Sequence, residues 1–326
     1  MITLHRRTNS AQLSKTKLPA VKCEAATRIS IRTSRNRSRS PNVEISQFQV
    51  NNIIPLSQAL SRSLLSSETL SYTPNPLSNH SILPEFRAKM IDWMIEVTSA
   101  FKCHKAVFFL AVKIMDKFFK VHQQALSSQL LHIIGVCCMF IASKFSDTRH
   151  RIRLGALREK IAHKKFTVSE ILITEKLILK KLGFIVNLST CYDFLQSLYE
   201  EFKIPNVIQV TAELICRISQ IYYKHLEFKQ SDIALSSVII AARSLRQDNL
   251  CEKMIPAKGK DKITEEVVEK LSRDVDKYAE KFPGYTSVFD FFNVTITSRK
   301  PGPLFVFCDI ELEQDQNKLL NSPNFL

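Results

Sequence analysis

Apolar side chains recur at helical spacing along most of the chain from Pro84 to about residue 290. Met90, Met94 and Val97 follow the proline at intervals of four and three residues, which predicts an amphipathic helix that begins at Pro84. The pattern predicts further helices at 106–120, 127–144, 154–162 and 168–182, with Gly183 as a C-terminal cap. Segment 106–120 is apolar on two faces and segment 127–144 nearly all round, so the latter is expected at the centre of a bundle.

A second cycle of the same kind follows, with predicted helices at 192–202, 205–224, 231–245 and 263–281. The most apolar helix of each cycle ends alike, with Ile-Ala-Ser-Lys at 141–144 and Ile-Ala-Ala-Arg at 240–243. The two cycles are offset by about a hundred residues, which is far longer than the repeat of a solenoid. The pattern therefore predicts an all-α protein of two tandem five-helix domains, at 84–186 and 187–292.

The ends of the chain have a different composition. Residues 1–50 are rich in Ser, Thr, Arg and Asn and poor in large apolar side chains, which predicts a disordered basic tail. Residues 51–83 combine one short helix, marked by Leu56, Leu60 and Leu64, with a proline-rich connector. Residues 293–326 are expected to form a C-terminal tail.

Positive charge is concentrated in the first tail. Residues 1–45 hold ten Lys and Arg against two Glu, which is over half of the net charge of +15. The remainder is only mildly basic, so charge alone does not favour nucleic-acid binding by the folded part. The basic cluster Thr33–Ser40 is typical either of a nuclear address or of solvated charge in a disordered segment. We expect the protein in nucleus and cytoplasm.

The composition argues against several other classes of protein. The six glycines lie too far apart for a phosphate-binding loop, and the eight cysteines show no metal-ligand spacing, so neither a cofactor nor a metal is expected. No apolar run reaches membrane-spanning length, the longest being Leu130–Ala142. We therefore expect a soluble intracellular protein with reduced, mostly buried cysteines, without contact to a membrane and without catalytic activity of its own.

Several stretches then resemble the cyclin family. The stretch Phe86–Val97 is similar to the family's Met-Arg-Ala-Ile-Leu motif with its following Asp-Trp, and Leu110–Phe118, Ile141–Phe145 and Glu175–Leu182 resemble its later box helices. Five signature positions of the family fall, in order and each on the matching helix, on Arg87, Asp116, Ile133, Lys144 and Glu175.

The resemblance implies two tandem cyclin folds and a regulatory subunit that binds and activates a cyclin-dependent Ser/Thr protein kinase, in cell-cycle control. It implies that Lys144, Phe145 and Glu175 contact the kinase, with Asp147 as a further candidate. The residues by themselves allow another interpretation, in which Lys144 is a cation at a helix C-terminus and Glu175 pairs within its own helix. A second possible function is a transcriptional cyclin or cyclin-fold transcription factor that contacts the transcription machinery or DNA.

Further roles follow from the same resemblance. Arg87 and Asp116 are expected to form a partly buried structural ion pair. A patch that docks kinase substrates is expected on the first box helix; an alternative is that Met90 and Trp93 are core residues. The expected patch consists of Phe86, Met90, Trp93 and Glu96. Lys89 and His132 depart from the family pattern there, and a lysine at the floor of such a groove disfavours a basic peptide. Residues 62–65 match the core of a degradation motif, but the residues that follow them do not support such a motif.

Overall fold

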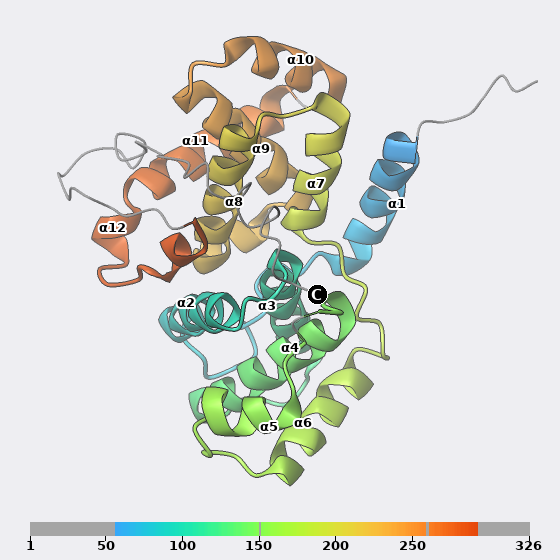
Figure 1. Ribbon diagram of the computed structural model, residues 1–326, viewed down its shortest axis with the longest axis vertical. Helices are drawn as coiled ribbons and strands as arrows, with labels where there is room; N and C mark the ends of the chain where they lie inside the picture. Colours follow the sequence, from blue (N-terminus) through green and yellow to red (C-terminus); the bar gives the residue numbers. More distant parts are fainter. Residues whose placement is uncertain (1–55, 150, 259–260, 293–326) are drawn as a thin grey trace, which may run out of the picture. The chain divides into compact units, whose positions relative to one another are not determined.

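The computed structural model of the chain describes residues 56–149, 151–258 and 261–292 (Figure 1). Within these ranges the regular elements are helices, and the only β-type pairing is an isolated bridge between Ser81 and Ser127. The all-α prediction is confirmed. The two tails predicted at 1–50 and 293–326, including the basic cluster at 33–40, lie outside the described residues.

The first fold is built around α4 (Leu131–Ser146), the helix that the sequence predicted to be central. Helix α4 packs against α2, α3 and α6 (Figure 1). A wider π turn at Leu157–Ile161 extends the single turn of α5. The helices that surround α4 have the following bounds: α2 Pro84–Ala100, α3 Lys105–Val121, α5 Leu154–Ala156 and α6 Val168–Lys181.

Close packing of α2 on α4 depends on Gly135. A Cβ atom at this position would lie 2.5 Å from the sulfur of Met90 and 3.1 Å from the methyl group of Met94. The stretch Ser128–Ser146 is also long and apolar enough to cross a membrane by length and composition, which corrects the expectation that no run reaches that length. Of the most apolar part of this stretch, 67% is buried inside the fold, which is typical of the central helix of a bundle.

The second fold repeats the arrangement around α9, which packs against α7, α8 and α11 (Figure 1). Its helices have the following bounds: α7 Cys191–Phe202, α8 Asn206–Ile221, α9 Gln230–Ser244, α10 Asp248–Lys258, α11 Asp261–Asp276 and α12 Tyr278–Lys281. Two details differ from the sequence-based expectation. Helix α10 was not predicted, and the segment predicted at 263–281 is divided at Lys277 into α11 and α12.

Helix α1 (Leu56–Ser71) joins the second fold although it precedes the first in sequence. The buried carboxylate of Glu68 accepts hydrogen bonds from the backbone N–H of Ser231 at 2.7 Å and from its hydroxyl at 2.9 Å. Ser231 lies in the first turn of α9, where backbone N–H groups lack partners within the helix and a negative charge is favourable. Residues 62–65, the degradation-motif core of the sequence, lie within this helix.

The described parts of both folds belong to one compact unit. Lys105 of α3 pairs with Glu213 of α8 at 2.6 Å, and the ring of Phe109 stacks on Tyr192 of α7 with 5.5 Å between centroids. The two folds are thus joined by polar and aromatic contacts.

The described cysteines are buried free thiols. Burial raises the pKa of Cys103 to about 11 and that of Cys137 to about 12. They are therefore protonated at neutral pH.

Candidate functional site

The C-terminal end of α4 meets α6 through an ion pair between Lys144 and Glu175. Lys144 lies in the last turn of α4, where a cation is favoured by the helix dipole, and its Nζ also lies 4.1 Å above the ring of Phe140. Its side chain is 38% exposed, whereas that of Glu175 is 10% exposed. The pair therefore has a buried acidic end and an open basic end.

This geometry corrects the alternative for Glu175 and agrees in part with that for Lys144. Glu175 is a buried residue of α6, and its described ionic partner is Lys144 of another helix, not a lysine of its own helix. Lys144 does lie at a helix C-terminus, as that interpretation held, but it also fixes α4 to α6. Lys144 and Glu175, which the cyclin resemblance assigned to one contact surface, are thus neighbours in the structure.

An exposed apolar border surrounds this ion pair. Phe145, next to Lys144 in the chain, is 51% exposed. On α6, Val168, Leu172 and Glu175 follow one another at intervals of four and three residues, which places them on one face of the helix. Val168 and Leu172 are both exposed. Apolar side chains that remain exposed beside a charged pair are typical of a protein-binding surface.

The end of α6 carries a further exposed aromatic side chain, in an unusual backbone conformation. Gly183 and Phe184 both have left-handed backbone angles, with φ of 59° and 61°. The N–H of Phe184 donates to the carbonyl of Leu179 at 2.8 Å and that of Gly183 to Lys180 at 3.1 Å, which together form a Schellman cap. The left-handed conformation is strained for a bulky side chain, and Phe184 is 66% exposed. The sequence showed Gly183 as a cap, but not that Phe184 is exposed.

Asp147 lies outside this surface. It is 4% exposed, and its carboxylate accepts from the backbone N–H of His104 at 2.7 Å and from that of Arg149 at 2.9 Å. Asp147 therefore holds the loop after α4 against the start of α3. Its candidacy as a contact residue is not supported by this inward position.

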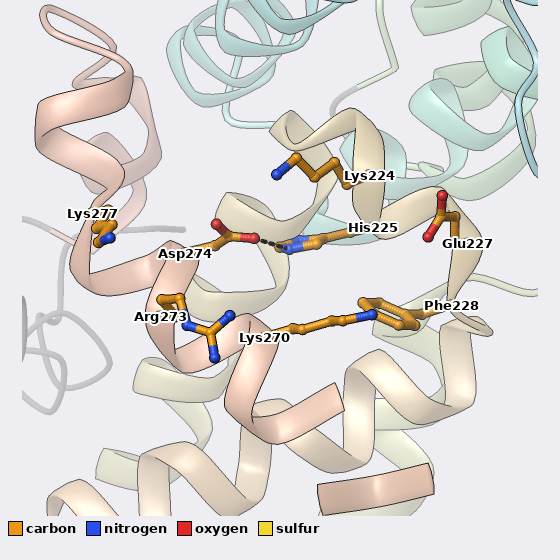
Figure 2. Close-up of a pocket in the computed structure, with 8 residues that line it drawn as sticks. All are labelled: Lys224, His225, Glu227, Phe228, Lys270, Arg273, Asp274 and Lys277. Atoms are coloured by element: carbon orange, nitrogen blue, oxygen red, sulfur yellow. Dashed lines mark hydrogen bonds and ion pairs between the residues drawn. The ribbon is translucent and has the colours of Figure 1, made fainter. Parts of the chain in front are cut away.

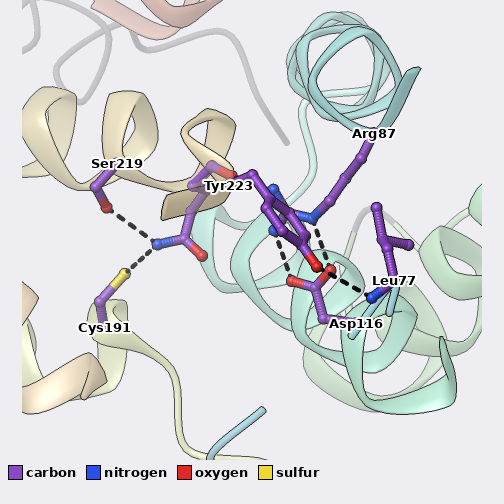
Figure 3. Close-up of polar contacts among 7 residues, drawn as sticks. Leu77, Arg87, Asp116, Cys191, Ser219 and Tyr223 are labelled. Atoms are coloured by element: carbon purple, nitrogen blue, oxygen red, sulfur yellow. Dashed lines mark hydrogen bonds and ion pairs between the residues drawn. The ribbon is translucent and has the colours of Figure 1, made fainter. Parts of the chain in front are cut away.

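Arg87 and Asp116 form a buried bidentate ion pair between α2 and α3 (Figure 3). The Nε of Arg87 donates to Asp116 at 2.8 Å and one Nη at 2.7 Å, and both side chains are at most 1% exposed. The other Nη donates to the backbone carbonyl of Gln220 at 2.9 Å. Gln220 lies in the last turn of α8, whose carbonyls lack helical partners. The pair therefore also ties the first fold to the second, which the sequence did not indicate.

The residues of the predicted docking patch differ in how far they are buried. Phe86 is 46% exposed and Glu96 is exposed, whereas Met90 is buried against Gly135 and belongs to the core. Trp93 is half-buried and contacts the ring of His132 edge to face, with 5.1 Å between centroids. Lys89 is exposed and thus does not form the floor of a groove. The alternative in which these residues are core therefore fits Met90, while Phe86 and Trp93 remain accessible.

No metal-binding group of three His, Cys, Asp or Glu side chains is present among the residues that the structure describes. The half-buried ring of His132 has a lowered pKa, because partial burial disfavours the cation and Lys165 and His163 lie nearby.

Comparison with known proteins agrees with this geometry. The sequence profile of the cyclin N-terminal domain matches residues 60–187, a region that contains the whole of α2 to α6 and most of α1. The chain is similar to Cyclin-B2-1 of Oryza sativa subsp. japonica, with 29% identity over 168 residues, and to Cyclin-B2-4 of Arabidopsis thaliana, with 26% identity over 174 residues. These matches cover 52% and 53% of this chain but only 39% and 40% of the relatives.

Among solved structures, the chain is similar to a viral cyclin from herpesvirus saimiri. The TM-score is 0.51 at 20% sequence identity, and the match covers 64% of this chain and 96% of the viral protein. At this identity the similarity shows a shared fold. The shared fold covers nearly the whole of the viral protein.

Proposed function

The chain belongs to the cyclin family and carries a cyclin box, and from this premise we propose that it binds and activates a cyclin-dependent Ser/Thr protein kinase. The observation that carries the proposal is the half-open Lys144–Glu175 ion pair, which has the exposed side chain of Phe145 next to it in the chain and that of Leu172 on the same face of α6. Relatives named as B-type and G2/mitotic-specific cyclins support a role in control of cell division.

The proposed mechanism follows from kinase chemistry. A kinase is active when its αC helix has moved inward, so that a glutamate of that helix pairs with the catalytic lysine, and when its activation loop is ordered. A partner that binds only the inward state shifts the population towards that state. The ammonium of Lys144 has three donors, of which Glu175 takes one, so the others are available for main-chain carbonyls of the kinase.

The apolar border supplies the remainder of the proposed interface. Phe145 and Phe184 would insert into apolar hollows of the kinase, as aromatic anchors commonly do at interfaces. The chain contributes no catalytic group in this scheme, because its effect is to stabilise one conformation of its partner. Kinase substrates are a second proposed class of partner, for the accessible Phe86 and Trp93 on α2.

The proposal is tested with the purified full chain and a panel of purified monomeric cyclin-dependent kinases. We expect the chain to raise the rate of histone phosphorylation by at least one of them by about a hundredfold or more, and to bind the same kinase in calorimetry. Phe145→Ala should weaken binding by roughly tenfold to a hundredfold, since truncation of a buried aromatic anchor typically costs about 2 kcal/mol.

Ile173→Ala is the matched control for Phe145→Ala. Ile173 is 65% exposed and lies on α6, but it is offset by about 160° from Glu175 around the helix. Kinase binding should be unchanged in this variant. If no kinase is bound and the chain instead shifts a DNA duplex with a steep salt dependence, the alternative of a DNA-contacting cyclin-fold protein is favoured.

A further inference from the structure

A basic pocket lies in the second fold, between the turn Tyr223–Glu227 that follows α8 and the last turns of α11 (Figure 2). Its volume is about 360 Å³. Four cationic side chains line it, and two carboxylates, Glu227 and Asp274, also contribute. The cations are Lys224, Lys270, Arg273 and Lys277. The pocket belongs to a different fold from the Lys144–Glu175 surface.

A buried imidazole forms part of the pocket wall. The ring of His225 is 2% exposed and lies against Tyr222, with 4.9 Å between centroids, and Phe228, with 5.9 Å. Its Nε2 contacts the carboxylate of Asp274 at 2.9 Å (Figure 2). This hydrogen bond is the main reason why the pKa of Asp274 is lowered, with smaller contributions from Lys281 and Lys224. The carboxylate of Asp274 is therefore already engaged within the protein.

Three of the four cations of the pocket form no comparable contact with the described residues. Within the described part of the chain, Lys224, Arg273 and Lys277 take part in no ion pair and no side-chain hydrogen bond, whereas Lys270 pairs with Glu266 at 2.9 Å. Arg273 follows Lys270 on α11 at an interval of three residues, so both lie on one side of the helix, and Lys277 lies directly after the end of α11, four residues beyond Arg273. Like charges at this spacing repel one another, and a bound anion would relieve that repulsion.

We propose that this pocket binds the phosphate group of a phosphoserine or phosphothreonine in a peptide. A phosphate monoester carries a charge of about −1.5 to −2 at pH 7 and three acceptor oxygens, which suits several convergent cations. Arg273 can bind two of these oxygens with its planar fork, while Lys224 and Lys277 supply point charges. The half-buried ring of Phe228 offers an apolar wall for the side chain beside the phosphorylated residue.

A nucleic acid fits the pocket less well. Its backbone presents a continuous series of charges, about one per 1.7 Å of duplex axis, and is best bound by an extended basic stripe. Here the cations converge on one cavity, and the carboxylate of Glu227 lines the same cavity. A single anionic group therefore matches the charge distribution better than a polyanion does.

The test uses the full chain and a fluorescein-labelled pentapeptide with alanines on both sides of one phosphoserine, followed by fluorescence anisotropy. The unphosphorylated peptide and inorganic phosphate are added as competitors. We expect the phosphopeptide to bind at least tenfold more tightly than either competitor. Arg273→Gln with Lys277→Gln should weaken phosphopeptide binding at least tenfold, because hydrogen bonds to charged groups are each worth about tenfold or more.

Lys203→Gln with Lys253→Gln is the charge-matched control. Both lysines are exposed in the second fold and neither lines the pocket, so binding should be unchanged. Thermal melts should show that both double variants remain folded, and both should still activate the kinase identified above. An equal loss in the two double variants would indicate unspecific attraction and overturn the proposal. So would equal affinity for inorganic phosphate and phosphopeptide, or tighter binding of a DNA oligonucleotide that is lost in Arg273→Gln with Lys277→Gln.

Discussion

Two ion pairs of the first fold join neighbouring helices but have different surroundings. Arg87 and Asp116 are enclosed, and the guanidinium binds both the carboxylate and a carbonyl of the second fold. Lys144 and Glu175 lie at the edge of the fold, with the ammonium open to solvent. The first pair uses its hydrogen-bonding capacity within the chain, whereas the second retains donors for another molecule.

The difference shows that an ion pair between two helices can serve either the stability of the fold or the binding of a partner. Removing one member of an enclosed pair leaves an isolated charge in the interior, which is costly in the folded protein itself. Removing one member of the pair at the edge of the fold costs the free protein less, because this pair is partly exposed to water. Stability should therefore depend mainly on Arg87, and partner binding mainly on Lys144.

The largest effect is expected for Arg87→Ala. The buried carboxylate of Asp116 and the carbonyl of Gln220 would both lose their partner, so the free energy of unfolding should fall by about 3–5 kcal/mol. Urea denaturation followed by circular dichroism measures this change. Lys89→Ala is the matched control, because Lys89 is exposed two residues further along α2 and should cost at most about 0.5 kcal/mol.

A double variant sharpens this prediction. Arg87→Leu with Asp116→Leu removes both charges, and it should recover a large part of the loss caused by Arg87→Ala. Recovery should remain incomplete, since the carbonyl of Gln220 would still lack its donor. A double variant as unstable as Arg87→Ala would indicate that packing of the arginine, and not its charge, holds the helices.

The next effect concerns the open pair. Lys144→Ala and Glu175→Ala should each weaken kinase binding by roughly 2–4 kcal/mol, since both groups become desolvated in the complex. Lys144→Ala should cost about 1–2 kcal/mol of stability, because it leaves the largely buried carboxylate of Glu175 without its ionic partner. Glu175→Ala should cost about 1 kcal/mol of stability, since Glu175 is buried. Calorimetric titration with the kinase and thermal melts separate the two effects; unchanged binding in both variants would remove this surface from the interface.

Lys113 tests burial of a charge without an ion pair. It is 5% exposed on α3 and forms no ion pair with the described residues, and burial lowers its pKa to about 8 in spite of nearby Asp116. The unfolded chain holds this proton up to its ordinary pKa of 10.5, so the group's contribution to stability rises as the pH increases from about 8 to 10.5. Lys113→Met should abolish this rise and stabilise the protein at pH 7 by on the order of 2–3 kcal/mol.

Unfolding free energies of wild type and Lys113→Met at pH 7 and pH 10 measure the effect. The difference between the two proteins should shrink at the higher pH. The tyrosines, whose pKa values burial raises in the folded protein, are common to both proteins, so their contribution largely cancels in this difference. A constant difference at both pH values would contradict a lowered pKa at Lys113.

The smallest effect is expected at Phe184. Phe184→Gly places a glycine at a left-handed position, which relieves strain of about 1 kcal/mol, so the melting temperature should rise by a few degrees or stay unchanged. Kinase binding should nevertheless weaken, because an exposed aromatic anchor has been removed. Loss of stability together with binding would show instead that Phe184 supports the end of α6.

Much of the helical architecture could be predicted from the sequence because its signals are local. The spacing of apolar residues identified α2, α3, α4 and α6 within a few positions, and Gly183 marked the end of α6. Helix α10 was missed because its apolar residues follow no clear helical repeat and it contains Pro256, which is unfavourable inside a helix. The division at Lys277 was also missed, since the apolar pattern continues across it.

The sequence by itself determined most of the helical segments, the central helix of each fold and the residues that carry the cyclin resemblance. Only the tertiary structure decided how the polar groups are paired. Arg87 binds a carbonyl 133 residues away and Glu68 caps a helix 163 residues away, while Glu175 binds Lys144 in preference to nearer lysines. Backbone hydrogen bonds and apolar periodicity act over a few residues, so a sequence displays them directly. The partner of a buried charge depends on which helices pack together, and packing is a property of the whole fold.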